Sequence, residues 1–264
     1  MFGLKNSFLV KSKIIMVCLC YTRQAIFLCY NAHMKEEQKT TLYIVATPIG
    51  NMEDITLRAL RILKEVDYVL CEDTRTTQNL LNKYEIKTKT MSYHAHSTEG
   101  KESVILNLLK AGKNLALVSD AGTPCISDPG VMLVAHVKKE LGGEVDVVPI
   151  PGASALVTAL SASGVSSAEF VFLGFLPHKK GRETLFKEIA HSKRVMVFYE
   201  STHRIMKTLT SLKEHAPEFK VVIGRELTKQ FEQFVEGTPA EILEYFTIND
   251  DKQRGEFVVI VEPK

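Results

Sequence analysis

Several sequence features that commonly announce a function are absent from this 264-residue chain. It contains no tryptophan, and its formal net charge is only +2, so no global basic field points to a nucleic-acid partner. Neither the dinucleotide fingerprint G-x-G-x-x-G nor the P-loop motif G-x-x-x-x-G-K-[ST] follows the first expected strand. No His, Cys, Asp and Glu cluster has metal-ligand spacing, and His94-Ala95-His96 is expected to be a polar loop. A common dehydrogenase, a P-loop enzyme and a metal site are therefore not favoured.

Cysteine is scarce outside the first 34 residues. Of the five cysteines, only Cys71 and Cys125 lie in the body of the chain, so we expect a reducing cytoplasm and no disulfide scaffold. The N-terminal stretch is basic and free of acidic residues, and charged or polar residues interrupt its apolar clusters. None reaches the roughly 18 to 20 apolar residues that a membrane helix needs, so we expect no membrane anchor. We interpret residues 1–40 as a disordered or non-native leader and Met34 as the natural start.

The full chain has ordinary globular composition, 45% apolar and 24% charged, and its body contains two patterns. In residues 41–152, short apolar strands alternate with helices, which predicts a mainly parallel sheet. Asp54 is expected to cap the first of these helices, with Leu57 on its apolar face. In residues 153–264, strands outnumber helices, and the pattern near 228–237 predicts antiparallel pairing. We therefore expect a two-domain α/β protein whose second sheet is mixed.

The stretch from Leu115 to Gly130, LALVSDAGTPCISDPG, reads as a buried strand that breaks into a long, stiff loop. Its glycines allow close backbone approach to a ligand, its prolines restrict the backbone, and Asp120 and Asp128 supply carboxylates. A plain strand-to-helix connection is the alternative, although such connections usually run only about 2 to 6 residues. Similar loops follow three other strands, and backbone N–H groups at the following helices suit a nucleoside-like ligand. These loops are 47–51, 72–75 and 151–155.

Motifs spread over residues 42–263 resemble one known family. They are VATPIGN, CEDTR, SDAGTP, ISDPG, PGASA, GFLPHK, FYESTHR, RELTK and GEFVVIVE. In this order they are similar to the small-subunit ribosomal RNA 2′-O-ribose cytidine methyltransferases, within the tetrapyrrole-methylase-like superfamily. Cys125 stands where that family usually has a glycine, which could tighten the loop. The leader has no counterpart in the family.

The resemblance implies a tetrapyrrole-methylase-like fold that binds S-adenosylmethionine in a cleft between the two domains and works as a homodimer. It also implies methylation of a cytidine ribose in the decoding region of small-subunit ribosomal RNA, within the 30S particle. The positions that match the family's cofactor contacts are Pro48, Ser119, Asp120, Ala121, Gly122, Ile126, Ser154, Ala155, Glu200 and Leu227. A small-molecule methylase of this fold and a non-catalytic assembly factor are the alternatives.

A ribose hydroxyl is a poor nucleophile at neutral pH, so we expect a carboxylate or imidazole to accept its proton. Glu72 is the first candidate and His94 the second, because they match positions of a proton acceptor and a donor in the tetrapyrrole branch. His94 could instead be a loop histidine, and Asp73 could pair with Arg75 as a structural ion pair. For RNA we expect a local basic patch and two deeper arginines. These residues are Lys179, Lys180 and Arg182, with Arg204 and Arg225.

Overall fold

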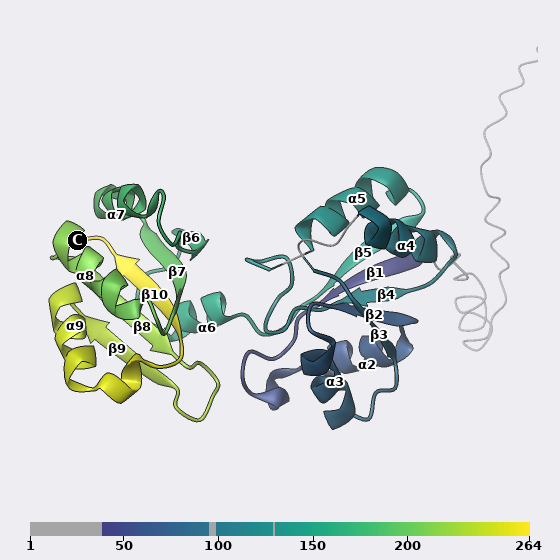
Figure 1. Ribbon diagram of the computed structural model, residues 1–264, viewed down its shortest axis with the longest axis horizontal. Coiled ribbons are helices and arrows are strands. Elements are labelled where there is room, and N and C mark those ends of the chain that lie inside the picture. Colours follow the sequence, from purple (N-terminus) through teal and green to yellow (C-terminus); the bar gives the residue numbers. More distant parts are fainter. Residues whose placement is uncertain (1–38, 95–98, 129) are drawn as a thin grey trace, which may run out of the picture. The chain divides into compact units, whose positions relative to one another are not determined.

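The computed structural model of the chain describes residues 39–94, 99–128 and 130–264. The predicted leader, residues 1–40, lies outside this described part except for its last two positions, so its character stays a prediction. Thr40 already begins the first strand. Residues Lys39–Lys264 form one compact unit that contains two five-stranded sheets, which Figure 1 colours along the sequence.

The first sheet has the strand order β3-β2-β4-β1-β5, and all its neighbouring strands run parallel, as predicted. The strands are β1 (Thr40–Val45), β2 (Tyr68–Cys71), β3 (Lys89–Ser92), β4 (Leu115–Leu117) and β5 (Val145–Ile150). The connecting helices are the short 3-10 helix η1 (Met52–Asp54), α2 (Leu57–Glu65), α3 (Thr74–Lys83), α4 (Glu99–Lys110) and α5 (Val131–Leu141). Parallel strands need such crossover connections, which explains the alternating pattern of the sequence.

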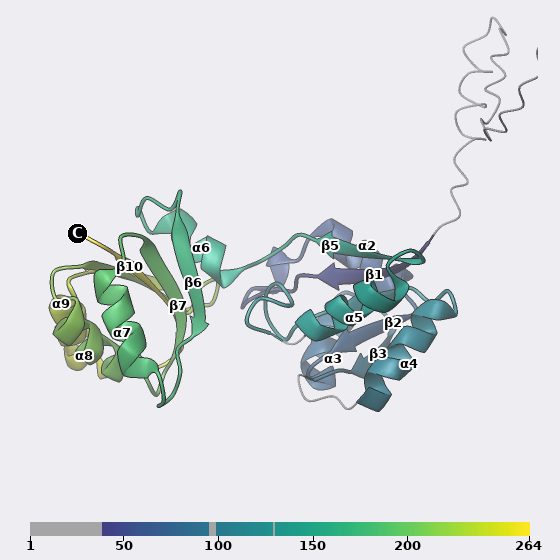
Figure 2. The ribbon, with the colours of Figure 1, turned by 90° about the horizontal axis from the view of Figure 1, so that it is seen from above.

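Helices cover both faces of the first sheet, with α2 and α3 on one face and α4 and α5 on the other (Figures 1 and 2). Successive residues of a strand point to opposite faces, so Val69 and Cys71 pack with α2 and α3 while Leu70 packs with α4 and α5. Because both faces are buried, the strands read as continuous apolar runs. Because all five strands run parallel, their carboxyl ends lie at one edge of the sheet.

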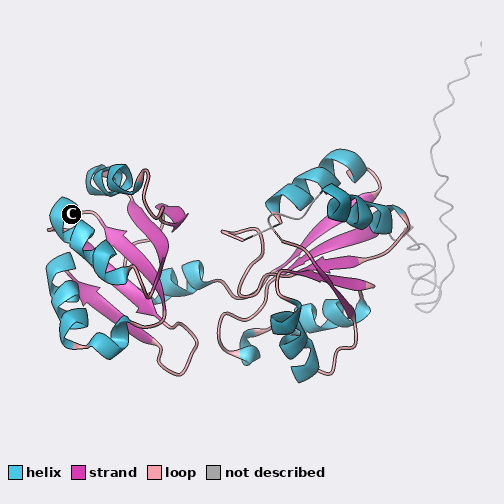
Figure 3. Cartoon of the chain, viewed as in Figure 1, coloured by secondary structure: helices cyan, strands magenta, loops and turns pink. Residues whose placement is uncertain are grey.

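The second sheet has the order β6-β7-β10-β8-β9. Its first pair is parallel and its other pairs are antiparallel, so it is the mixed sheet that the sequence predicted. Its strands are β6 (Phe170–Phe175), β7 (Val195–Ser201), β8 (Lys220–Arg225), β9 (Gln233–Gly237) and β10 (Glu256–Glu262). Its helices are α6 (Ala155–Ala162), α7 (Arg182–His191), α8 (Ile205–His215), α9 (Pro239–Ile248) and the 3-10 helix η2 (Asp250–Gln253), seen in cyan in Figure 3.

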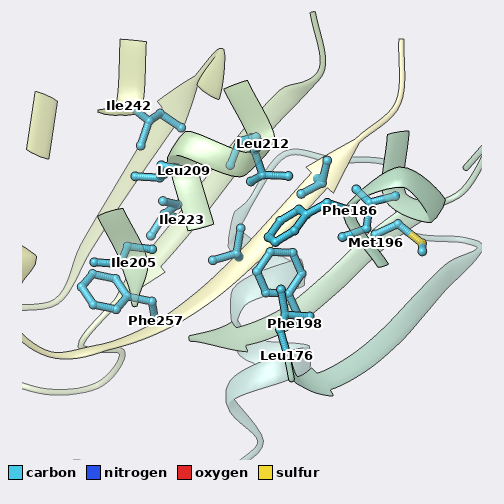
Figure 4. Packing of buried hydrophobic residues seen from close by; sticks show 14 of the residues in the cluster. Leu176, Phe186, Met196, Phe198, Ile205, Leu209, Leu212, Ile223, Ile242 and Phe257 are labelled. Atoms are coloured by element: carbon cyan, nitrogen blue, oxygen red, sulfur yellow. The ribbon is translucent and has the colours of Figure 1, made fainter. Parts of the chain in front are cut away.

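The core of the second half lies between its sheet and helices α7, α8 and α9. Figure 4 shows the ring of Phe186 from α7 beside that of Phe198 from β7, with Leu209 and Leu212 of α8 nearby. All four side chains are fully buried. Helix α6 covers the opposite face, where Leu160 packs with a second apolar cluster. The sheet is therefore held on both sides, and its strand ends cannot shift without disturbing packed side chains.

One expectation about helix α2 was wrong. Asp54 does not cap it but lies in the preceding turn η1, and the cap is Thr56, whose side chain accepts a hydrogen bond from the Ala59 N–H at 3.1 Å. The helix consequently begins at Leu57, which is 86% exposed, while Ala59 and Ile62 are buried. Thr56 has an extended backbone, and its hydroxyl satisfies one of the free N–H groups at the start of the helix. The spacing of apolar residues does not show which residue makes this hydrogen bond.

Among the helices in the described part of the chain, none is both long and apolar enough to cross a membrane. A search of the same residues finds no group of three or more His, Cys, Asp or Glu residues arranged to hold a metal ion.

We expect Thr56→Ala to lower the free energy of unfolding by about 1 kcal/mol, because it leaves the Ala59 N–H without its side-chain acceptor. Asp54→Ala is the matched control and should change stability by less than about 0.5 kcal/mol. Urea denaturation monitored by circular dichroism measures both values. Equal losses in the two variants would show that η1 and α2 are capped as one unit.

Candidate active site

A cavity of about 390 Å³ lies at the carboxyl ends of the first sheet's strands and is lined by residues from both halves of the compact unit. From the first half it is lined by Ile49, Glu72, Asp120, Ala121, Gly122, Thr123, Ile126, Ser127 and Asp128. From α6 and its cap, from the second sheet and from the β8–β9 connection come Ser154, Ala155, Phe175, Tyr199, Glu200, Ser201, Leu227, Lys229, Glu256, Phe257 and Val258. Its volume falls in the range of small-molecule sites, about 300 to 1,000 Å³.

The structure brings most of the predicted cofactor residues together at this cavity. Those that line it are Asp120, Ala121, Gly122, Ile126, Ser154, Ala155, Glu200 and Leu227. Pro48 and Ser119 do not line it. Ser119 is buried, and its hydroxyl donates to the carbonyl of Gly122 at 3.1 Å, so it holds the loop from within. Contact between these residues and a cofactor stays a prediction.

The loop 119–130 is tied to the loops that follow β1 and β5. Thr47 and Gly122 form a two-way backbone bridge, with N–H to oxygen distances of 2.9 and 3.1 Å. The Thr123 hydroxyl donates to the carbonyl of Ala153 at 3.0 Å. Two residues of the loop that are not glycine, Cys125 and Ser127, have positive φ angles of 68° and 63°. Such conformations cost free energy and persist where surrounding contacts impose them, often beside a functional site.

Cys125 explains the family difference noted in the sequence. Cys125 has a left-handed backbone conformation. Glycine adopts this conformation without the steric penalty of a Cβ, so glycine is the expected residue at this position. The thiol sulfur lies 2.8 Å from the position that a Cβ on Gly130 would occupy, so Gly130 must stay a glycine. The Cys125 side chain thus packs against Gly130 inside the loop, and a tighter cofactor loop stays a prediction.

Asp120 joins the loop to the end of β2. Its carboxylate accepts a hydrogen bond from the Asp73 N–H at 3.1 Å. Asp73 itself caps α3 and pairs with Arg75 at 2.8 Å, so the structural ion pair considered from the sequence is present. Hydrogen bonds from Arg75 lower the pKa of Asp73 to about 2. Asp73 thus serves the backbone, and the neighbouring Glu72 is the acidic residue of this segment that lines the cavity.

Three carboxylates gather on the first half's side of the cavity: Glu72, Asp120 and Asp128. Burial, and then the negative charges of Glu72 and Asp120, raise the pKa of Asp128 to about 6. A carboxyl group whose pKa approaches neutrality can accept a proton more effectively than an exposed aspartate. Asp128 was recognised in the sequence as a loop carboxylate but not as a catalytic candidate, because only its neighbours in space raise its pKa.

Glu200 is only 1% exposed, and four groups surround its carboxylate. It accepts hydrogen bonds from the Ser201 N–H at 2.9 Å and the Thr208 hydroxyl at 2.6 Å, and it pairs with Arg204 Nε at 2.8 Å. The guanidinium of Arg182 lies 3.6 Å away. A buried carboxylate needs such partners because its desolvation costs several kcal/mol. Glu200 is therefore a rigid, charged part of the cavity wall.

This network changes the interpretation of three residues predicted to bind RNA. Arg182 is 6% exposed, and Arg204 holds Glu200 and the carbonyl of Leu176, so neither guanidinium is presented to an external phosphate. Arg225 is 8% exposed and donates to the carbonyls of Arg254 and Phe231. A sequence shows that a residue is basic, but burial and internal acceptors decide whether it can meet a ligand.

The remaining predicted residues lie apart from the cavity wall. Lys179 and Lys180 are exposed in the segment between β6 and α7, consistent with a surface patch. His94 is exposed just after β3 and does not line the cavity, although Glu72 does. Glu72 and His94, the two alternative candidates for the proton acceptor, follow the ends of the neighbouring strands β2 and β3, and of these two only Glu72 lines the cavity.

Several cavity residues were not predicted. The most informative are Phe175, Tyr199 and Lys229, and each falls inside a motif that was already recognised: GFLPHK, FYESTHR and RELTK. Lys229 Nζ pairs with Glu226 and Glu256, each at 2.9 Å, and supplies a positive charge in a mainly acidic lining. Motif membership was the available signal, but it does not tell which side chain of a motif faces the ligand.

Comparison with known proteins defines the class. Residues 41–243 match the family described as Tetrapyrrole (Corrin/Porphyrin) Methylases. The solved structure of the cobalamin biosynthetic enzyme cobalt precorrin-4 methyltransferase, CbiF, is similar with a TM-score of 0.60 at 18% identity, covering 84% of this chain and 94% of that one. At this identity the likeness concerns the fold alone, and it agrees with the predicted two-sheet architecture.

Closer sequence relatives narrow the family. "Ribosomal RNA small subunit methyltransferase I" of Halalkalibacterium halodurans is 46% identical over 88% of this chain and 78% of its own length. The protein of the same name from Thermotoga maritima is 46% identical over 84% of this chain and 98% of its own. The chain belongs to this ribosomal RNA small subunit methyltransferase I family, within the tetrapyrrole methylases.

Family membership implies S-adenosylmethionine as methyl donor, and the cavity suits it. The donor carries a positively charged sulfonium and ammonium, which the carboxylates Glu72, Asp120 and Asp128 favour electrostatically. Lys229 offers a counter-charge for a carboxylate, and Leu227 and Val258 add apolar surface for an aromatic base. When bound, the donor supplies an electrophilic methyl group, which these residues would align and shield from water.

The raised pKa of Asp128 predicts a pH-dependent stability. A folded pKa of about 6 against about 3.9 in the unfolded chain means that the folded protein binds more protons between these values. The ionised Asp128 therefore destabilises the fold at pH 8, and this loss disappears as the pH falls through 6 towards 4. We expect Asp128→Asn to be more stable than the wild type at pH 8, by about 1 kcal/mol after allowance for solvent screening, and equal to it near pH 4.

Urea denaturation at pH 4, 6 and 8 measures this difference. Asp73→Asn is the control of opposite sign, because hydrogen bonds with Arg75 lower the pKa of Asp73 and its charge favours the folded state above pH 4. A stability gain in Asp128→Asn that does not vary with pH would show that packing, rather than charge, is responsible.

Proposed function

We propose that this protein transfers a methyl group from S-adenosylmethionine to the 2′-hydroxyl of a cytidine ribose in the decoding region of small-subunit ribosomal RNA, within the 30S particle. The observation that carries the proposal is the 46% identity, over 88% of the chain, to a protein named ribosomal RNA small subunit methyltransferase I. The cytidine 2′-hydroxyl and the 30S particle rest on the resemblance of SDAGTP, ISDPG and FYESTHR to that family. The cytoplasm and a homodimer belong to the same proposal and rest on the same resemblance.

The cavity contains the groups that such a reaction needs. A ribose hydroxyl becomes a better nucleophile when a carboxylate accepts its proton. Glu72 lines the cavity, and within the described part of the chain it forms no ion pair and caps no helix. Burial, and then the charges of Glu72 and Asp120, raise the pKa of Asp128, so Asp128 is a second carboxyl group of the cavity suited to proton transfer. Glu72 is the proposed proton acceptor. His94 is exposed just after β3, outside the cavity wall, and stays the second candidate.

The proposed RNA contacts also become narrower. Lys179 and Lys180 keep their role as phosphate contacts, because both are exposed. Arg182, Arg204 and Arg225 are withdrawn from it, because their guanidinium groups are bound inside the protein. The acidic cavity suits the cationic methyl donor, and the exposed segment with Lys179 and Lys180 suits the polyanionic RNA.

Incubation of the full chain with methyl-labelled S-adenosylmethionine and purified 30S particles tests the proposal. The expected result is one labelled methyl group per particle, located on a cytidine 2′-oxygen by nuclease digestion and mass spectrometry. Labelling of a tetrapyrrole instead would indicate a small-molecule methylase. Donor binding without labelling of either substrate would indicate an assembly factor. Either outcome overturns the proposed substrate.

We expect Glu72→Gln to slow single-turnover methylation of 30S particles by roughly 10²- to 10⁴-fold, because the amide cannot accept the hydroxyl proton. His94→Ala, outside the cavity, should reduce the rate by less than about threefold. Calorimetry with S-adenosylmethionine measures donor affinity in both variants, and the rates are compared at saturating donor. A loss below tenfold in Glu72→Gln would mean that orientation alone drives the reaction or that another carboxylate accepts the proton.

A further inference from the structure

Phe175, the last residue of β6, is an aromatic side chain in the cavity lining that remains 56% exposed. Single exposed apolar residues are common on protein surfaces and need no explanation. Phe175 differs from them because it lies at the wall of the cavity and because its ring and backbone are held in place. The contacts that hold it point to a ligand with a flat apolar face.

The ring of Phe175 packs edge-on against Tyr199, with centroids 5.3 Å apart and an interplanar angle of 61°. Tyr199 in turn packs edge-on against Phe172 at 4.9 Å. Edge-to-face contacts of this kind stabilise one ring orientation. The three rings therefore form a supported group in which Phe172 and Tyr199 are the more buried members and Phe175 is the exposed one.

An irregularity in β6 directs Phe175 towards the cavity. The register with β7 shifts between Phe172 and Phe175, and Gly174 within this shift has a φ of 63°. A Cβ on Gly174 would come within 2.8 Å of the Ser127 Oγ, so the strand approaches loop 119–130 more closely than a larger residue allows. Bulges in strands commonly redirect one side chain beside an active site.

Internal hydrogen bonds secure the residues that follow Phe175. Arg204 donates to the carbonyl of Leu176 at 2.6 Å, and Arg182 donates to the carbonyl of Pro177 at 3.3 Å. Both arginines also contact Glu200, directly or through the Thr208 hydroxyl, and Glu200 lines the same cavity. The segment after Phe175 is thus linked to the cavity wall at two consecutive carbonyl groups.

The same segment carries positive charge outward. Lys179 and Lys180 follow Phe175 by four and five residues and are exposed, and the chain then enters α7 at the buried Arg182. An aromatic ring beside exposed basic side chains is the combination that proteins use for single-stranded RNA, because bases stack on rings and phosphates pair with cations. A purely apolar ligand would not need the lysines.

We propose that Phe175 stacks against the nucleobase of the nucleotide that is methylated, while Lys179 and Lys180 contact its flanking phosphates. Arg204 and Arg182 are positioning residues that hold the Phe175 segment against the cavity wall. This inference rests on the proposed function, in which the substrate is RNA. A base is attached directly to its ribose, so a base held at the cavity wall brings the ribose hydroxyls to the carboxylates.

The test compares Phe175→Leu and Phe175→Tyr in the full chain, with 30S particles and S-adenosylmethionine measured separately. Phe175→Leu should weaken 30S binding roughly 5- to 150-fold, because leucine keeps apolar bulk but loses the stacking surface. Phe175→Tyr should restore binding to within about threefold, and donor affinity by calorimetry should stay unchanged in both. Phe231→Leu is the matched control, since Phe231 is 65% exposed but does not line the cavity.

Two results would overturn the inference. Unchanged 30S binding in Phe175→Leu would remove the stacking contact, and an equal loss of donor affinity would assign the ring to the adenine of S-adenosylmethionine instead. Binding is measured without turnover, so a wild type that binds 30S particles but does not methylate them would count against the proposed function alone. The Phe175 comparison would still decide the inference.

Arg204→Lys tests the positioning role. Lysine replaces the planar guanidinium with one compact ammonium group, which cannot donate to both Glu200 and the Leu176 carbonyl. We therefore expect 30S binding to fall about tenfold. In the Phe175→Leu background the same change should have little further effect, because the residue that it positions is already lost. If Arg204→Lys weakens 30S binding by the same factor in both backgrounds, Arg204 has a structural role only. A melting temperature that falls equally in both backgrounds would support that structural role.

Discussion

The buried carboxylate of Glu200 is the constraint on which the second half of the site depends. At 1% exposure it has lost its hydration, and only the surrounding donors compensate for that loss. Those donors come from β7, from the start of α8 and from the start of α7, so satisfying one charge also places three elements. The arginines that provide the compensation have donors left over, and these hold the carbonyls of Leu176 and Pro177. A single buried charge thereby links the cavity wall to the exposed segment that carries Lys179 and Lys180.

Charge has a different role in the first half of the site. Glu72, Asp120 and Asp128 share one side of the cavity, and burial, followed by repulsion from the other two carboxylates, raises the pKa of Asp128. This arrangement costs stability, which proteins commonly accept at functional sites. A cationic methyl donor relieves the repulsion, whereas a polyanionic substrate does not. The acidic interior favours a cationic ligand, and the basic segment outside it favours an anionic one. This separation agrees with the transfer of a methyl group from a sulfonium compound to RNA.

The strain in the loop 119–130 belongs to the same picture. Cys125 and Ser127 adopt left-handed conformations. The Thr47 hydroxyl donates to the carbonyl of Ser119, and the Ala153 carbonyl accepts from the Thr123 hydroxyl, so the loop is held on both sides. Neither feature would persist in an isolated loop, because free chains avoid such angles. The neighbouring strand ends of the parallel sheet supply the contacts that impose them. The sequence attributed a stiff loop to its prolines, and the structure adds contacts with the loops after β1 and β5.

Local pattern was enough to establish the two-sheet α/β fold, the parallel order of the first sheet and the motifs that meet at the cavity. Strand and helix periodicities are properties of neighbouring residues, and parallel strands align their carboxyl ends whatever the rest of the chain does. Thr56 replaced Asp54 as the cap of α2 because capping depends on one hydrogen bond rather than on periodicity. Arg182, Arg204 and Arg225 read as RNA-binding residues until their burial was known, and Phe175 read as one more apolar residue at the end of a strand. The burial of a side chain and its ion pairs depend on residues that are distant in sequence. Only the tertiary structure therefore decides which charged side chains are paired inside the protein and which side chains face a ligand.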